Sequence, residues 1–169
     1  MAAMGETHVM ANVMTPNFTH KRFSHLLKAE VGQKRGHCPF ERFICMNSGS
    51  ESVTVAFRIA DVNAKNQTAA DASHAGKTIK ILSLDGSFHG RTDRPAQASD
   101  SCLGKYKKVL ASHAGLNNLI TVPPNNVEAL QQAFAQADAN NEFIELMLVE
   151  PVMGEGDPGL GITREFYDT

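Results

Sequence analysis

The sequence has few of the residues that mark disulfide-rich, metal-binding or membrane proteins. Its 169 residues include no tryptophan and three cysteines, none of which lies in a CxxC pair. A disulfide scaffold and a zinc module are therefore not predicted, no metal site is expected, and reduced thiols indicate a cytoplasmic protein. No apolar run approaches the roughly 20 residues that cross a bilayer, so we expect no membrane association.

Positive charge is also not in excess. The 16 Lys and Arg residues are offset by 18 Asp and Glu residues, which leaves a net charge of −2 at pH 7. This balance argues against a nucleic-acid partner, which requires a positive surface. With 42% hydrophobic residues, the chain has enough apolar material for a globular domain. Residues 1–10 contain Glu6 and His8 and have no apolar core, so no secretory signal is expected there, and residues 1–16 are interpreted as an N-terminal tail or entry segment.

Helical and strand-like apolar patterns alternate along the rest of the chain. A helix is predicted over residues 17–31, with Asn17 or Thr19 as its cap. The further predictions, in chain order, are a strand over 41–46, a helix after residue 51, a polar loop over 66–76, a strand over 78–84, an irregular functional loop over 86–116, a strand over 119–122, a helix over 127–138 capped by Asn126 and a strand over 143–149. The apolar faces of the second and third helices are predicted to be Val53, Ala56, Phe57 and Ala60, and Val127, Leu130, Phe134 and Ala137. This alternation predicts an α/β fold with a mainly parallel sheet and flanking helices.

The first motif that carries chemistry spans residues 47–51, just before the second helix. Ser48 and Glu51 have the spacing of a capping box, in which the serine accepts a first-turn amide. Gly49 allows close approach of the backbone to a ligand. Free amides and the positive end of the helix dipole then predict a phosphate site. The alternative interpretation is a plain helix cap.

Two further motifs follow predicted strands. Residues 86–92 place Phe88 and His89 among glycines, where an aromatic ring offers a flat face; the alternative is a turn with a buried phenylalanine and a structural histidine. Residues 150–156 place Glu150 and Glu155 around a Gly/Pro turn; the alternative is a solvent-facing turn. Because ligands bind beyond the carboxyl ends of parallel strands, all three motifs are expected at one edge of the sheet.

In their order and spacing, these motifs resemble the class III pyridoxal-phosphate-dependent aminotransferases, the ornithine, GABA and acetylornithine type. The matching strings are Asn47–Glu51, Phe88–Thr92 and Glu150–Gly156, followed by Phe166 and Tyr167. The resemblance implies a fold-type I transferase, with residues 17–169 as the N-terminal portion of its cofactor-binding large domain. It also implies an amino acid or ω-amine donor, a 2-oxo acid acceptor and a homodimer.

The resemblance also implies a role for each matching residue. Gly49 and Ser50 would hold the cofactor phosphate by backbone amide and hydroxyl. Phe88 would stack on the pyridine ring with His89 beside it. Glu150 would lie under the cofactor near its ring oxygen, and Glu155 would be a substrate-gating glutamate that pairs with an arginine. Arg91 and Thr92 would brace the loop.

Two functional elements of the family have no match in these residues. The aspartate that bonds the pyridine nitrogen is not found, because Asp168 follows Phe166 and Tyr167 too closely. No lysine lies in the context of the Schiff-base lysine. Transamination needs that lysine to carry the cofactor and move a proton, so no catalytic residue is assigned and the 169 residues alone are predicted to be inactive.

Three interpretations remain open from the sequence. The first is a front portion of an aminotransferase, and the second is a catalytically silent domain that binds pyridoxal phosphate or phosphate, or assists assembly. A third interpretation is a phosphate-binding module that is unrelated to transaminases and is built on Ser48, Gly49 and Ser50.

Overall fold

The computed structural model describes residues 18–169, which form two compact units that divide after Cys45. In the first unit, helix α1 (Phe18–Gly32) confirms the predicted helix. Thr19 lies inside this helix, while Asn17 and the expected boundary at residue 16 lie outside the described residues. None of the helices from residue 18 onward is long and apolar enough to cross a membrane.

The predicted strand over residues 41–46 is wrong. This segment is irregular, and Ile44 and Met46 are exposed. Its apolar residues match a strand pattern, but a strand also needs a hydrogen-bonding neighbour. The sheet among the described residues has three strands, none of which pairs with this segment.

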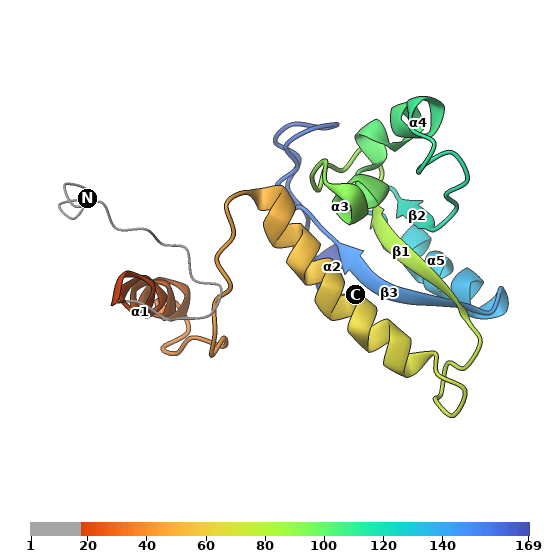
Figure 1. Cartoon of the computed structure of the whole chain (residues 1–169). Coiled ribbons are helices and arrows are strands. Elements are labelled where there is room, and N and C mark those ends of the chain that lie inside the picture. Colours follow the sequence, from red (N-terminus) through yellow and green to blue (C-terminus); the bar gives the residue numbers. More distant parts are fainter. Residues whose placement is uncertain (1–17) are drawn as a thin grey trace. The chain divides into compact units, whose positions relative to one another are not determined.

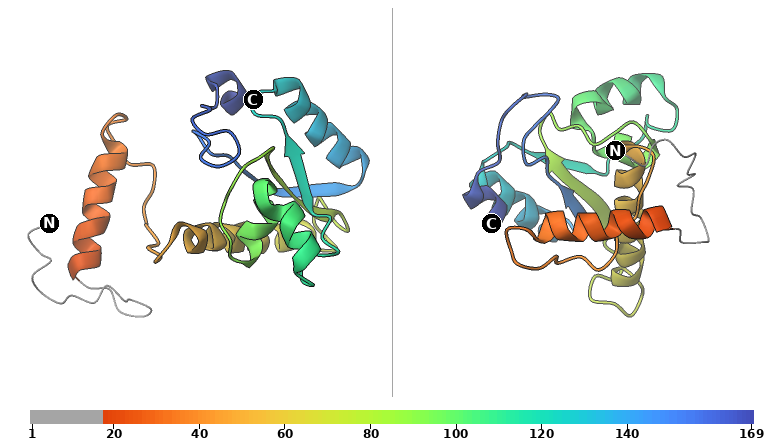
Figure 2. Two further views of the ribbon diagram at one scale, coloured as in Figure 1. Left: turned by 90° about the horizontal axis from the view of Figure 1, so that it is seen from above. Right: turned by 90° about the vertical axis from the view of Figure 1, so that its left-hand side faces the viewer.

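The second unit is built on a parallel sheet, as predicted. Strand β1 (Thr78–Leu84) lies between β2 (Leu119–Val122) and β3 (Glu142–Leu148), and both pairings are parallel. Helix α2 (Gly49–Gln67) and helix α5 (Val127–Ala139) cover opposite faces of the sheet (Figure 1; Figure 2). The predicted strands and helices of this region are thus confirmed within one or two residues at their ends.

Alternating residues of β1 build a core on each face. Leu82 and Leu84 pack beneath α5, whereas Ile81 packs against Phe57 of α2. Burial of a side chain as large as Phe57 contributes about 2 kcal/mol. Two predicted core positions are wrong: Ala56 is exposed, and Phe134 is 46% exposed because Leu130, Ala133 and Ala137 form the buried face of α5.

The predicted irregular stretch over residues 86–116 contains two helices, α3 (Asp93–Ala98) and α4 (Asp100–Val109). Their sequences lack helical periodicity for different reasons. The last four residues of the six-residue α3 are all buried, so burial along this helix follows no helical period. In α4, Leu103 is the one buried residue, so α4 has almost no apolar face. Tertiary packing therefore decides both helices.

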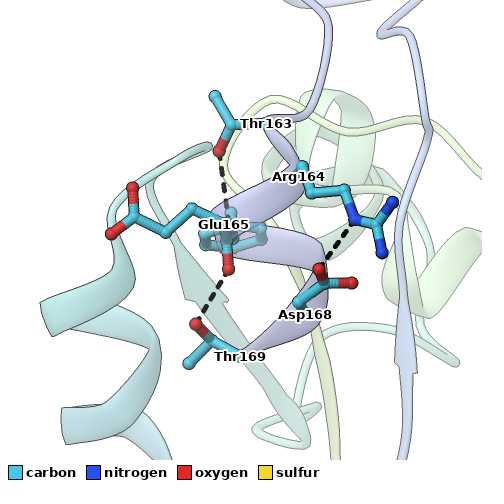
Figure 3. A network of polar contacts seen from close by, with 6 residues as sticks. Thr163, Arg164, Glu165, Asp168 and Thr169 are labelled. Atoms are coloured by element: carbon cyan, nitrogen blue, oxygen red, sulfur yellow. Dashed lines mark hydrogen bonds and ion pairs between the residues drawn. The ribbon is translucent and has the colours of Figure 1, made fainter.

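A short helix, α6 (Arg164–Asp168), secures the segment that follows β3 (Figure 3). Thr163 caps it by accepting the Phe166 amide at 3.2 Å, and Arg164 pairs with Asp168 at 2.7 Å. The Thr169 hydroxyl donates to the carbonyl of Glu165 at 2.9 Å. Phe166 is buried in the α5-side core, which anchors the end of the segment.

Candidate functional site

The loops after β1 and β3 meet at the carboxyl edge of the sheet, where the sequence places two of the three motifs. Gly156 has a φ of +85°, and a Cβ at this position would overlap the carbonyl oxygen of Gly86. Only glycine fits so close a backbone contact. The contact holds residues 150–156 against residues 86–92.

Side chains from several elements hold the backbone of residues 86–92. The N–H of Gly86 donates to Asp100 at 2.8 Å, and the N–H of His89 donates to Ser99 Oγ at 2.9 Å. The N–H of Phe88 donates to Glu150 at 2.9 Å. Because separate elements satisfy neighbouring amides, the loop has little freedom to change its path.

Glu150 connects the two loops. One carboxylate oxygen accepts the Phe88 amide, and the other accepts the Gly154 amide at 3.1 Å. The sequence indicates that a glutamate at this strand end needs a partner, because an isolated buried charge is costly. The partners are these two backbone amides rather than a cation.

The third motif, at the start of α2, adjoins the 86–92 loop. Ser48 caps the helix: its Oγ accepts the Glu51 amide and donates to the Glu51 carboxylate, both at 3.2 Å. The predicted cap is confirmed, although no strand precedes it. The amides of Gly49 and Ser50 have no partner within the helix, since they belong to its first turn.

Gly90 brings the 86–92 loop onto Ser50. Gly90 has a φ of +121°, and a Cβ there would lie 2.5 Å from Ser50 Oγ. Ser50 Oγ accepts the Arg91 amide at 3.3 Å, and the Thr92 hydroxyl donates to the Ser50 carbonyl at 3.2 Å. The Ser50 hydroxyl keeps a proton to donate, and nothing lies within 4 Å of a Cβ at Gly49. The start of α2 is therefore open to an anion.

Phe88 and His89 are both half-buried. The Arg91 guanidinium lies 5.5 Å from the centre of the Phe88 ring, within cation–π range. Burial lowers the pKa of His89 below 6.5, and the negative charge of Glu150 opposes this shift. His89 Nε2 is buried and has no hydrogen-bond partner in residues 18–169. Burial thus favours the neutral form of the His89 imidazole.

Glu155 lies on the more exposed of the two loops. The Glu155 side chain is exposed, whereas Met153, two residues earlier, is 2% exposed and packs in the core. The loop thus has a fixed base and an accessible carboxylate. The structure brings Gly49, Ser50, Phe88, His89 and Glu150 to one edge, with Glu155 on the loop beside them.

Two further residues, Ser99 and Asp100, shape this site and were not predicted from the sequence. Both lie at the junction of α3 and α4 and reach back to the 86–92 loop. The Ser99-Asp100-Ser101 string is typical of a helix start, and that signal can place α4. It cannot show which loop the two side chains contact.

The lysines of β1 and its leading turn lie away from the candidate site. Lys77 pairs with Asp138 at 2.7 Å, and Lys80 pairs with Glu142 at 3.1 Å. Both pairs lie toward the amino ends of β1 and β3, whereas the site lies at the carboxyl ends. The amino groups of these two lysines are therefore not directed at the site.

The second unit is thus a three-layer α/β fold that has an open helix start and an aromatic loop at one edge of its sheet. The family model "Aminotransferase class-III" matches residues 2–164, so the chain belongs to the class III aminotransferases. The family resemblance stated from the motifs is confirmed. Pyridoxal phosphate is the cofactor of this family.

Solved structures of ornithine aminotransferase from Toxoplasma gondii have the same fold. One, from strain ME49, aligns with 99% of this chain at a TM-score of 0.67 and 17% identity. Another, crystallised with oxidised glutathione and partly occupied by pyridoxal phosphate, aligns with 95% of this chain at a TM-score of 0.61 and 18% identity. This chain covers 35% and 33% of those two chains, about a third of their length.

Proposed function

We propose that the chain forms part of a pyridoxal-phosphate-dependent aminotransferase and supplies the side of the site that holds the cofactor phosphate and ring. The whole enzyme transfers an amino group from an amino acid or ω-amine to a 2-oxo acid, as a cytoplasmic homodimer. When bound, the cofactor supplies an electron sink for that transfer. The contact of Ser50 with Gly90 and Arg91 carries the proposal, because it joins a phosphate-type helix start to the loop of Phe88.

The start of α2 has the properties of a phosphate site. The unpaired amides of Gly49 and Ser50 point out of a 19-residue helix whose dipole favours an anion there. Ser50 adds a hydroxyl proton, and the absence of a side chain at Gly49 leaves room for an oxygen. These features support binding of a phosphate monoester by Gly49 and Ser50.

The 86–92 loop supports binding of an aromatic ring next to that phosphate. Phe88 offers its face to the pyridine ring, and His89 lies beside the ring as a neutral group. Glu150 accepts the Phe88 amide, which fixes the backbone at Phe88 and places a negative charge next to the 86–92 loop. The exposed carboxylate of Glu155 is free to exchange partners, which suits a substrate-gating residue.

The described residues hold the cofactor but do not supply the proton-transferring lysine. Lys77 and Lys80 are paired at the opposite edge, and Lys105, Lys107 and Lys108 are exposed on α4. We therefore expect weak, non-covalent cofactor binding and no transamination by the 169 residues alone.

The experiment is a titration of the chain with pyridoxal phosphate and, separately, with inorganic phosphate. Ser50→Ala removes a bond to the phosphate, so it is expected to weaken both ligands about tenfold. Phe88→Ala removes ring stacking, so it is expected to weaken pyridoxal phosphate about threefold to tenfold and leave phosphate unchanged. Phe40→Ala, at an exposed phenylalanine of the first unit, is the matched control. Equal loss of both ligands in Phe88→Ala would count against ring recognition and favour a simple phosphate module.

A further inference from the structure

One buried hydroxyl, that of Ser99, connects residues 86–92 to the junction of α3 and α4. Ser99 is fully buried between α3 and α4. Its Oγ accepts the His89 amide at 2.9 Å and lies 2.9 Å from the carbonyl oxygens of Gly90 and Pro95, which share its one proton. The hydroxyl therefore satisfies both a donor and an acceptor of the loop.

The two loop groups that Ser99 holds belong to the part of the loop that joins Phe88 to the contact with Ser50. His89 follows Phe88, whose own amide donates to Glu150. Gly90 packs on Ser50, at the phosphate-type helix start. Ser99 thus sets the spacing between the ring residue and the phosphate residue without facing the site itself.

We infer that Ser99 is a positioning residue for cofactor binding, which it supports by holding Phe88 and Ser50 at the spacing that one pyridoxal phosphate molecule requires. The inference rests on the proposed function. Inorganic phosphate needs the start of α2 alone, whereas pyridoxal phosphate needs the helix start and the ring together. Loss of the Ser99 hydroxyl therefore lowers affinity for pyridoxal phosphate more than affinity for phosphate.

The test compares Ser99→Ala with Ser83→Ala in the full chain. Ser83 is equally buried, and its hydroxyl bonds Ser87 Oγ at the start of the loop and the Ala98 carbonyl, but it makes no hydrogen bond with residues 88–92. Both variants lose one buried hydroxyl, so a general loss of stability affects both. The readouts are the dissociation constants for pyridoxal phosphate and inorganic phosphate, the circular dichroism that the bound cofactor acquires, and hydrogen exchange of the His89 amide.

In Ser99→Ala the His89 amide is expected to exchange about tenfold faster, because it loses its buried acceptor. The affinity for pyridoxal phosphate is expected to fall about tenfold with the induced circular dichroism diminished, while phosphate binding stays within about twofold. Ser83→Ala is expected to keep both the ratio of the two affinities and the His89 exchange rate. If Ser99→Ala does not fold, Ser99→Cys, with its weaker acceptor, is expected to show the same changes at smaller size.

Two results would overturn the inference in distinguishable ways. An unchanged affinity ratio and His89 exchange rate in Ser99→Ala, or in Ser99→Cys where that variant replaces it, would show that the hydroxyl does not set the loop, and the proposed function would stand. No pyridoxal phosphate binding by the unmodified chain would contradict the proposed function and remove the role of Ser99 with it.

Discussion

The loop after β1 and the loop after β3 leave the same edge of the sheet, but different parts of the molecule hold them. Residues 86–92 are held from outside, by side chains of α2, β3's end and the α3–α4 junction. Residues 150–161 are held mostly by themselves, through the backbone bonds of Met153 to Leu160 and of Gly159 to Met153, both 2.9 Å. An isolated antiparallel bridge joins Val152 to Gly161.

The two kinds of support give the two loops different freedom to move. A loop whose amides are bonded to several elements cannot move without breaking contacts in each of them. A loop that bonds to itself can shift as a unit about its anchors, Met153 and Gly156. The first arrangement fits the proposed ring-binding role of Phe88, and the second fits the proposed gating role of Glu155.

The largest effect is expected where the two loops touch. In Gly156→Ala the new methyl group overlaps the Gly86 carbonyl and takes a left-handed backbone, so we expect a loss of about 3 kcal/mol or more in the free energy of unfolding. Gly159→Ala is the control, because Gly159 has a φ of +90° and nothing within 4 Å of a Cβ. It should cost about 1–2 kcal/mol. Denaturant unfolding measures both, and equal losses would contradict the contact.

A smaller effect is expected where Glu150, in the loop after β3, supports residues 86–92. In Glu150→Gln one of the two accepting oxygens becomes an NH2 group that faces a backbone amide, so unfolding free energy should fall by about 1–3 kcal/mol. Glu155→Gln, at an exposed carboxylate, should change it by less than about 0.5 kcal/mol. The same denaturant measurement compares the two, and a Glu150→Gln variant as stable as Glu155→Gln would mean that Glu150 does not support the loop.

The smallest effect concerns the contribution of His89 to the pH dependence of stability. Burial lowers the pKa of His89 below the 6.5 of an unfolded histidine. Below pH 6.5 the unfolded chain therefore binds a proton more readily than the folded chain, so the contribution of His89 is full above that pH and falls as pH drops. Thermal unfolding at neutral and mildly acidic pH should show a shallower loss for His89→Asn than for the unmodified chain. Parallel losses would contradict a buried neutral His89.

Local chemistry explains which parts of the fold were predictable. The caps of Ser48 and Asn126 depend on side chains within three residues, and both form as predicted. The strand over 78–84 is bounded by turn residues and is apolar enough to be buried on both faces. Such local signals can be recognised within a short stretch of the sequence.

The candidate site was predictable in its residue types and its edge but not in its contacts. The motifs place Phe88 and Glu150 after neighbouring strands, and parallel pairing brings those strand ends together. The bond from the Phe88 amide to Glu150 joins residues 62 positions apart. No local pattern specifies such a bond, because it depends on how the two loops are arranged in space after their strands end.

By itself, the sequence determined the family, the order of the three strands and of helices α1, α2 and α5, and the edge of the sheet at which the motifs lie. Those features depend on period, caps and motif order, which are properties of neighbouring residues. Only the tertiary structure decided that residues 41–46 form no strand, that Phe134 is half exposed, and that Ser99 and Asp100 hold the loop. Each of these outcomes depends on which distant backbone or side chain supplies a partner, and hydrogen bonding and burial are decided by that partner.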